Sequence, residues 1–100
     1  MARGRKPYDT VTVYRYGVVR LPANYPKRRS QRLVAHHKAG VLTIGPAIGE
    51  PGYKPIFGTS AVSGVLNLTR LFRFWGLDPA KLAGEYQPKI RNGVLSIHFS

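Results

Sequence analysis

The chain has 100 residues, and its 16 lysines and arginines against 4 acidic residues give a formal net charge of +12. Such an excess opposes folding through self-repulsion, so a polyanionic partner is the simplest reason to keep it. A hydrophobic content of 43% excludes a fully disordered basic tail, and the absence of cysteine excludes a disulfide framework or thiolate metal site. No apolar run approaches the roughly 18 residues of a membrane helix, and no apolar region follows the basic N-terminus as in a secretory signal, so we expect a cytoplasmic protein.

The N-terminal part of the chain is predicted to hold most of the charge and the first half of the fold. Residues 1–9 are expected to form a flexible basic arm, and residues 10–46 the first half. Thr10 to Leu21 alternates apolar and polar residues, which indicates a half-buried strand with a bulge or bend at Gly17. A basic connector follows at 27–32, and two apolar segments around residues 36–40 predict a β-hairpin.

The C-terminal part begins with a linker rich in glycine and proline at 47–58, and residues 59–100 form the second half. Residues 60–68 are predicted to be extended. Thr69 is predicted to cap a short helix that Gly76 ends, and Asp78-Pro79 to start a further turn. Residues 85–90 and 94–99 are predicted strands, and Asn92-Gly93 between them is typical of a type I′ hairpin.

Two segments recur in the same order along the chain. The sequence GVVRL at 17–21 returns as GVLNL at 64–68, and GVLTI at 40–44 returns as GVLSI at 93–97. The two glycines are 23 residues apart in the first half and 29 in the second, where the predicted helix lies between the matches. This order favours an internal duplication; the alternative is two unrelated hairpins with similar strand chemistry.

The second repeat carries a family resemblance. Residues 64–79, then Leu82 and residues 92–97, resemble one AbrB-type swapped-hairpin unit: a glycine, alternating apolar residues, a short helix ending in an apolar-Gly-apolar step, and a hairpin with glycine. The first half resembles it at 17–22 and 40–44. Departures are Val18 and Val65, where the family often has a basic residue, and Thr69 at the proline position. The first half keeps Pro22 but lacks the helix.

The resemblance implies a mostly β fold in which two βαββ-like repeats interleave their hairpins into one β-barrel, with one short helix near 69–76. Here the two units are fused in one chain, as a monomeric pseudo-dimer or a homodimer of such chains. It also implies a DNA-binding transcription regulator, from an archaeon or an archaeal virus, which would place a viral protein in the host cytoplasm.

The basic residues are the candidate DNA contacts. The cluster at 27–29 with Arg32 is predicted to bind phosphates. Arg15 and Arg20 either read base edges or face solvent, and the arm either enters a minor groove or follows the backbone. The family's basic helix residues correspond best to Arg70 and Arg73. The full predicted set is Arg3, Arg5, Lys6, Arg15, Arg20, Lys27, Arg28, Arg29, Arg32, Lys38, Arg70 and Arg73.

Other candidate chemistries find less support. Tyr8, Tyr14, Tyr16 and Tyr25 are interpreted as rings that edge the core with hydroxyls in water, the alternative being a platform for unpaired bases. Histidines 36 and 37 would point to opposite faces of a strand, which argues against a metal site. The four acids are scattered and no phosphate loop precedes a helix, so we predict no enzyme, no cofactor and no small-molecule substrate.

Double-stranded DNA is therefore the predicted partner, with no membrane association. The alternative is a small basic RNA-associated protein of ribosomal type, which would also be short, basic and rich in strands.

Overall fold

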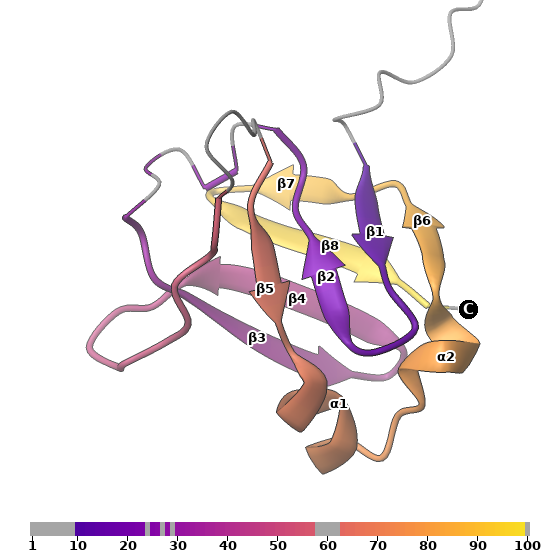
Figure 1. Cartoon of the computed structure of the whole chain (residues 1–100). Helices are drawn as coiled ribbons and strands as arrows, with labels where there is room; N and C mark the ends of the chain where they lie inside the picture. Colours follow the sequence, from indigo (N-terminus) through magenta and orange to yellow (C-terminus); the bar gives the residue numbers. More distant parts are fainter. Residues whose placement is uncertain (1–9, 24, 27, 29, 58–62, 100) are drawn as a thin grey trace, which may run out of the picture.

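The computed structural model describes residues 10–23, 25, 26, 28, 30–57 and 63–99, and in it two four-stranded antiparallel sheets lie face to face (Figure 1). The first sheet, in the order β5-β2-β1-β6, is formed by β1 (Val11–Val13), β2 (Val18–Arg20), β5 (Val65–Asn67) and β6 (Gly84–Tyr86). The second, in the order β3-β4-β8-β7, is formed by β3 (Leu33–Lys38), β4 (Val41–Pro46), β7 (Lys89–Arg91) and β8 (Val94–His98). The mostly β class is thus confirmed, but the described strands do not close into a barrel.

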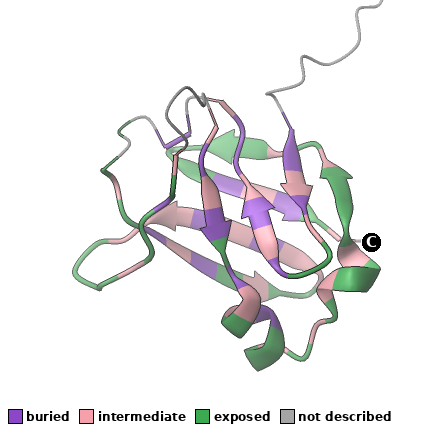
Figure 2. Ribbon diagram, in the orientation of Figure 1, coloured by how far each residue is buried: buried purple, intermediate pink, exposed green. Residues whose placement is uncertain are grey.

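The core lies between the sheets because alternate residues of each strand point inward. Val11, Val19 and Leu66 of the first sheet meet Leu42 and Ile97 of the second, and all five side chains are buried (Figure 2). The intervening residues of the same strands are half-buried or exposed. Both sheets therefore present an outer face of their own to solvent.

The segment from Thr10 to Leu21, predicted as one strand with a bend, is a hairpin. Val13 pairs with Val19, and the amide of Gly17 donates to the carbonyl of Tyr14 at 2.9 Å. Gly17 adopts φ +96°, a left-handed conformation that favours glycine and allows the chain to reverse. The alternation of apolar and polar residues that suggested one strand continues through both strands of the hairpin, β1 and β2.

The helical region also differs from the prediction of one helix. Two short helices form, α1 (Thr69–Phe74) and α2 (Pro79–Leu82). Leu68, not Thr69, is the N-cap of α1. Asp78 caps α2 by accepting a hydrogen bond from the Ala80 amide at 3.0 Å, as the Asp-Pro step predicts.

The predicted strand at 85–90 is divided between the two sheets. Its first part belongs to β6 and its last part to β7, with Gln87 and Pro88 between them. Proline has no amide hydrogen to continue the ladder. Part of the predicted linker at 47–58 also pairs: Tyr53 bridges to Leu33, and Ile56 bridges to Val65.

The repeated segments pair with each other. In β2 and β5, Val19 lies opposite Leu66, its counterpart in the repeat; in β4 and β8, Thr43 lies opposite its counterpart Ser96. Antiparallel pairing centred on equivalent residues relates the two halves by an approximate two-fold rotation. The two hairpin turns match as well, because Ala39 and Asn92 adopt φ 54° and 55°.

Candidate functional site

The structure places the predicted contact residues in separate regions. Arg3, Arg5, Lys6, Lys27 and Arg29 lie outside the described residues. Arg20 is half-buried. The rest are exposed, and they are Arg15, Arg28, Arg32, Lys38, Arg70 and Arg73.

The first region joins the β1–β2 turn (residues 14–17) to α1, and we call it the hairpin–helix corner. The amide of Leu68 donates to the carbonyl of Gly17 at 3.0 Å, and the Thr69 hydroxyl lies 2.9 Å from the carbonyl of Tyr16. A Cβ on Gly17 would lie 2.8 Å from the Thr69 Cα, so only glycine fits this approach. The corner therefore holds Arg15 of the turn close to the start of the helix that carries Arg70 and Arg73.

The tyrosines divide among different environments. Tyr14 and Tyr16 stack with ring centroids 5.9 Å apart and planes 9° apart, and Tyr16 is 62% exposed. The prediction that these rings edge the core is therefore wrong for Tyr16. Tyr25 is buried, and its hydroxyl lies 2.7 Å from the carbonyl of Ile44 and 2.8 Å from that of Gly93 instead of in water. Tyr8 lies outside the described residues.

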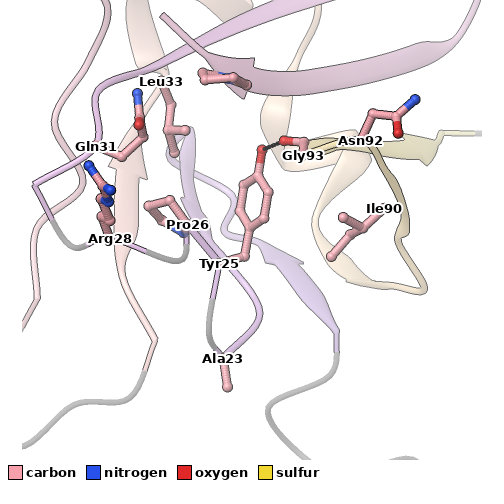
Figure 3. Close-up of a pocket in the computed structure, with 10 residues that line it drawn as sticks. Ala23, Tyr25, Pro26, Arg28, Gln31, Leu33, Ile90, Asn92 and Gly93 are labelled. Atoms are coloured by element: carbon pink, nitrogen blue, oxygen red, sulfur yellow. Dashed lines mark hydrogen bonds between the residues drawn. The ribbon is translucent and has the colours of Figure 1, made fainter.

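The second region is the described part of the connector at 27–32, together with Tyr25 and Pro26 before it. Tyr25 anchors it to the β7–β8 turn, and Arg28 and Gln31 line a cavity of about 670 Å³ between the two (Figure 3). Burial raises the pKa of Tyr25 to about 12, which a backbone hydrogen bond from Leu95 partly opposes. This tyrosine keeps its proton at neutral pH and acts as a structural anchor. The exposed charges here come from Arg28 and Arg32.

The outer face of the first sheet carries little net charge. Arg20 donates to the Thr12 hydroxyl at 3.1 Å, so its guanidinium lies along the sheet. Glu85 lies opposite Thr12 on the other side, on the same face. One arginine and one glutamate thus share this row.

Lys38 belongs instead to the outer face of the second sheet, together with basic residues that sequence reasoning missed. Lys89 and Arg91 alternate with Ile90 on β7, and His98 alternates with the buried Ile97 on β8. That alternation around the Asn-Gly turn was the signal that could have found them. We call this surface, defined by His36, Lys38, Thr43, Lys89, Arg91, Ser96 and His98, the basic sheet face.

The structure also bears on metals and membranes. His37 faces Trp75 and Phe99, with ring centroids 5.7 and 5.9 Å away, whereas its neighbour His36 is exposed. Within the described residues, no three histidine, cysteine or acidic side chains gather as a metal site would require. In the same part of the chain, no helix has the length and apolar character to cross a bilayer.

Comparison with known proteins adds no family: no protein-family model, curated protein or solved structure matches this chain. The functional argument therefore depends on the geometry and charge of the chain itself.

Proposed function

We propose that this protein binds double-stranded DNA through exposed basic side chains of the hairpin–helix corner and the connector, as a transcription regulator. The observation that carries the proposal is the availability of its charge. Arg15, Arg28, Arg32, Arg70 and Arg73 are exposed, and none forms an ion pair within the described part of the chain. Arginines in this state are ready to replace the counterions of a phosphate backbone.

The fold supports a fused swapped-hairpin pair as the scaffold. The first-half strand β1 pairs with the second-half strand β6 through Val11 and Tyr86, and the first-half strand β4 pairs with the second-half strand β8 through Thr43 and Ser96. Each half thus completes a sheet of the other, which is what interleaved hairpins require. The symmetric pairing of β2 with β5 and of β4 with β8 supports the duplication inferred from sequence.

The two-fold relation gives the proposed contact surface its layout. The corner belongs to the second-half helix and the connector occupies the corresponding place in the first half. The turn that carries Arg15 precedes β2 and the connector follows it, so basic residues lie beyond both ends of this strand, which suits an elongated polyanion better than a small ligand.

A salt-dependent titration tests the proposal. The protein is titrated with duplex DNA, single-stranded DNA and duplex RNA of one length and sequence at several salt concentrations. We expect duplex DNA to bind best, with log affinity falling linearly with log salt at about 0.9 per phosphate contacted. Equal or tighter binding of duplex RNA would favour the RNA-associated alternative, and tighter binding of single strands would make the stacked tyrosines a base platform.

Matched variants locate the contacts. Arg15→Gln with Arg70→Gln removes two exposed charges from the corner, and Lys54→Gln with Lys81→Gln removes two exposed charges elsewhere. Because charged hydrogen bonds contribute about 1.5–3 kcal/mol each, the corner variant should lose at least about tenfold in affinity for every duplex sequence. The control variant should stay within about threefold of the wild type. Equal losses in both variants would show that only net charge matters.

A further inference from the structure

The outer face of the second sheet assigns a second site to this protein: we propose that the basic sheet face binds the phosphate backbone of another DNA duplex, so that one chain bridges two duplexes. This inference rests on the proposed function, since it needs a first duplex at the corner. It adds the basic sheet face as a second DNA-binding surface, and bridging of two duplexes as an activity that one site cannot supply.

The strand register sets the layout of this face. A row across all four strands runs from His36 on β3 through Thr43 and Ser96 to Lys89 on β7. A neighbouring row contains Lys38, Val41 and His98, and Arg91 lies beside Val94 at the other end. Side chains directly opposite each other in a sheet have Cβ atoms about 5 Å apart, so these groups form one continuous surface.

The charge of the face is of one sign. Lys38, Lys89 and Arg91 are exposed cations, and exposed imidazoles at His36 and His98 add hydrogen-bonding groups. None of the described residues on this face is acidic, whereas Glu85 lies on the corresponding face of the first sheet. Such a surface attracts polyanions and repels a second copy of itself, which favours nucleic acid over self-association.

The centre of the face suits phosphate oxygens. Thr43 and Ser96 lie opposite each other at the approximate two-fold axis. The Thr43 hydroxyl donates a long hydrogen bond to the carbonyl of His36 at 3.4 Å, and the Ser96 hydroxyl can donate to a phosphate oxygen. A shallow hollow of about 700 Å³ lies beside them and is lined by Thr43, Lys89, Ile90, Arg91, Asn92, Val94 and Ser96. Hydroxyl donors flanked by lysine and arginine are a common chemistry for backbone contacts to DNA.

The corner and the basic sheet face are separated by the core, whereas the connector adjoins the basic sheet face, because Ile90 and Asn92 line both the connector cavity and the hollow. Arg15 lies in the turn between β1 and β2 of the first sheet, whereas Lys89 and Arg91 belong to β7 of the second sheet and are exposed. Figure 1 shows these elements. Because the buried faces of the sheets meet between Arg15 and these two residues, a duplex bound at the corner leaves the basic sheet face open. Bridging by a single chain is the consequence.

Bridging is measured by capture: a duplex fixed to beads retains a second, fluorescent duplex only if protein links them. The variant Lys89→Gln with Arg91→Gln is compared with the corner variant and with Lys54→Gln with Lys81→Gln. We expect the sheet-face variant to lose at least about fivefold in captured duplex while single-duplex affinity changes by less than about threefold. The Lys54/Lys81 control should bridge like the wild type, and thermal unfolding confirms that all variants fold.

The outcomes separate the two proposals. Wild-type protein that binds a duplex without capturing a second overturns the bridging inference and leaves the proposed function in place. Wild-type capture that the sheet-face variant retains in full also overturns it, because bridging would then use another surface. If the wild type binds no duplex, the proposed function fails first. Sedimentation with short duplexes should show two duplexes for each chain, and one duplex per chain would contradict the inference.

Discussion

The segment at 21–32, which ends in the connector, and the helical segment at 68–76 occupy equivalent places in the two halves but have different structures. Leu21 and Tyr25 correspond to Leu68 and Phe72, each pair being 47 residues apart, and all four are buried. Only the second segment forms a helix. The comparison teaches that the aromatic anchor is retained while the structure around it changes.

Proline accounts for the difference. Pro22 and Pro26 stand where the helical segment has Thr69 and Arg73. Pro22 would stand at the first helical position, where proline is tolerated. Pro26 lacks the amide hydrogen that a helix needs after its first turn, and it restricts the residue before it to extended conformations. In the second half, Trp75 packs against Phe72 and His37, with centroids 5.8 and 5.7 Å away. In the first half Arg28 takes the position of Trp75.

The consequence is visible at the two hairpin turns. His37 is covered by Trp75, whereas its counterpart Ile90 is 52% exposed and lines the cavity beside Tyr25. The equivalent position therefore holds a packed Trp75 in the second half and an exposed, charged Arg28 in the first half. The four predictions that follow test how far this division extends, from the largest expected effect to the smallest.

Truncating the helical anchor should have the largest effect. Phe72 is fully buried and contacts both Trp75 and Phe99. Phe72→Ala removes its transfer free energy and leaves a cavity, which should lower the free energy of unfolding by about 3–5 kcal/mol. Urea denaturation followed by tryptophan fluorescence measures this loss. A loss below about 1 kcal/mol would mean that α1 is not part of the cooperative core.

The two equivalent glycines, Gly17 and Gly64, should respond unequally to alanine. At Gly17 a Cβ would lie 2.8 Å from the Thr69 backbone, at φ +96°. At Gly64 the closest atom is the far end of the Phe57 ring, also at 2.8 Å, which can move more easily. We expect Gly17→Ala to cost about 2–3 kcal/mol and Gly64→Ala less. Urea midpoints of the two variants give the comparison, and equal losses would contradict it.

Prediction from sequence was most reliable where a short residue pair strongly favours one local backbone structure. Asn92-Gly93 predicted a hairpin turn, and Asp78-Pro79 predicted the start of a helical turn, and both are confirmed. The sheet to which each strand belongs was not predictable in the same way. Short strands such as β6 and β7 owe their partners to tertiary pairing, which no local pattern encodes.

The candidate site was only partly predictable for a similar reason. Counting charges found the basic residues of the N-terminal part, but it could not tell that Arg20 lies along the sheet against Thr12. Lys89 and Arg91 were missed because each is separated from the main cluster in sequence. The pairing of β7 with β8 places them on the same outer face as Lys38.

Removing the hydroxyl of the connector anchor should have a moderate effect that depends on pH. Tyr25→Phe leaves the carbonyls of Ile44 and Gly93 without this donor and should cost about 1–2 kcal/mol at pH 7. The pKa of Tyr25 in the folded state is raised from 10.0 to about 12, so the folded protein holds its proton more tightly than the unfolded chain. Wild-type stability should therefore fall as pH rises from 10 to 12.

The variant lacks this ionisation, so its stability should fall less steeply over the same pH interval. Urea midpoints at pH 7, 10 and 11 give the comparison. Tyr86 also has a raised pKa and remains in both proteins, so its contribution cancels in the difference. Parallel pH profiles for wild type and variant would contradict a buried, neutral Tyr25.

The smallest effect is expected at the two hairpin turns, where the backbone φ angles of the two halves match. Ala39 and Asn92 occupy the same left-handed position, at φ 54° and 55°, and a glycine follows each. Alanine is strained there, while asparagine tolerates the conformation and is favoured in type I′ turns. Ala39→Asn should raise the free energy of unfolding by about 0.5–1 kcal/mol, and Asn92→Ala should lower it by a similar amount. Both positions are exposed, so packing changes little.

The double exchange, measured by urea denaturation, should restore wild-type stability because the turns lie in separate hairpins and their effects add. A net change beyond about 0.5 kcal/mol would show that the surroundings of the two turns also contribute. Those surroundings differ, because Trp75 packs against His37 beside one turn and Ile90 is exposed beside the other.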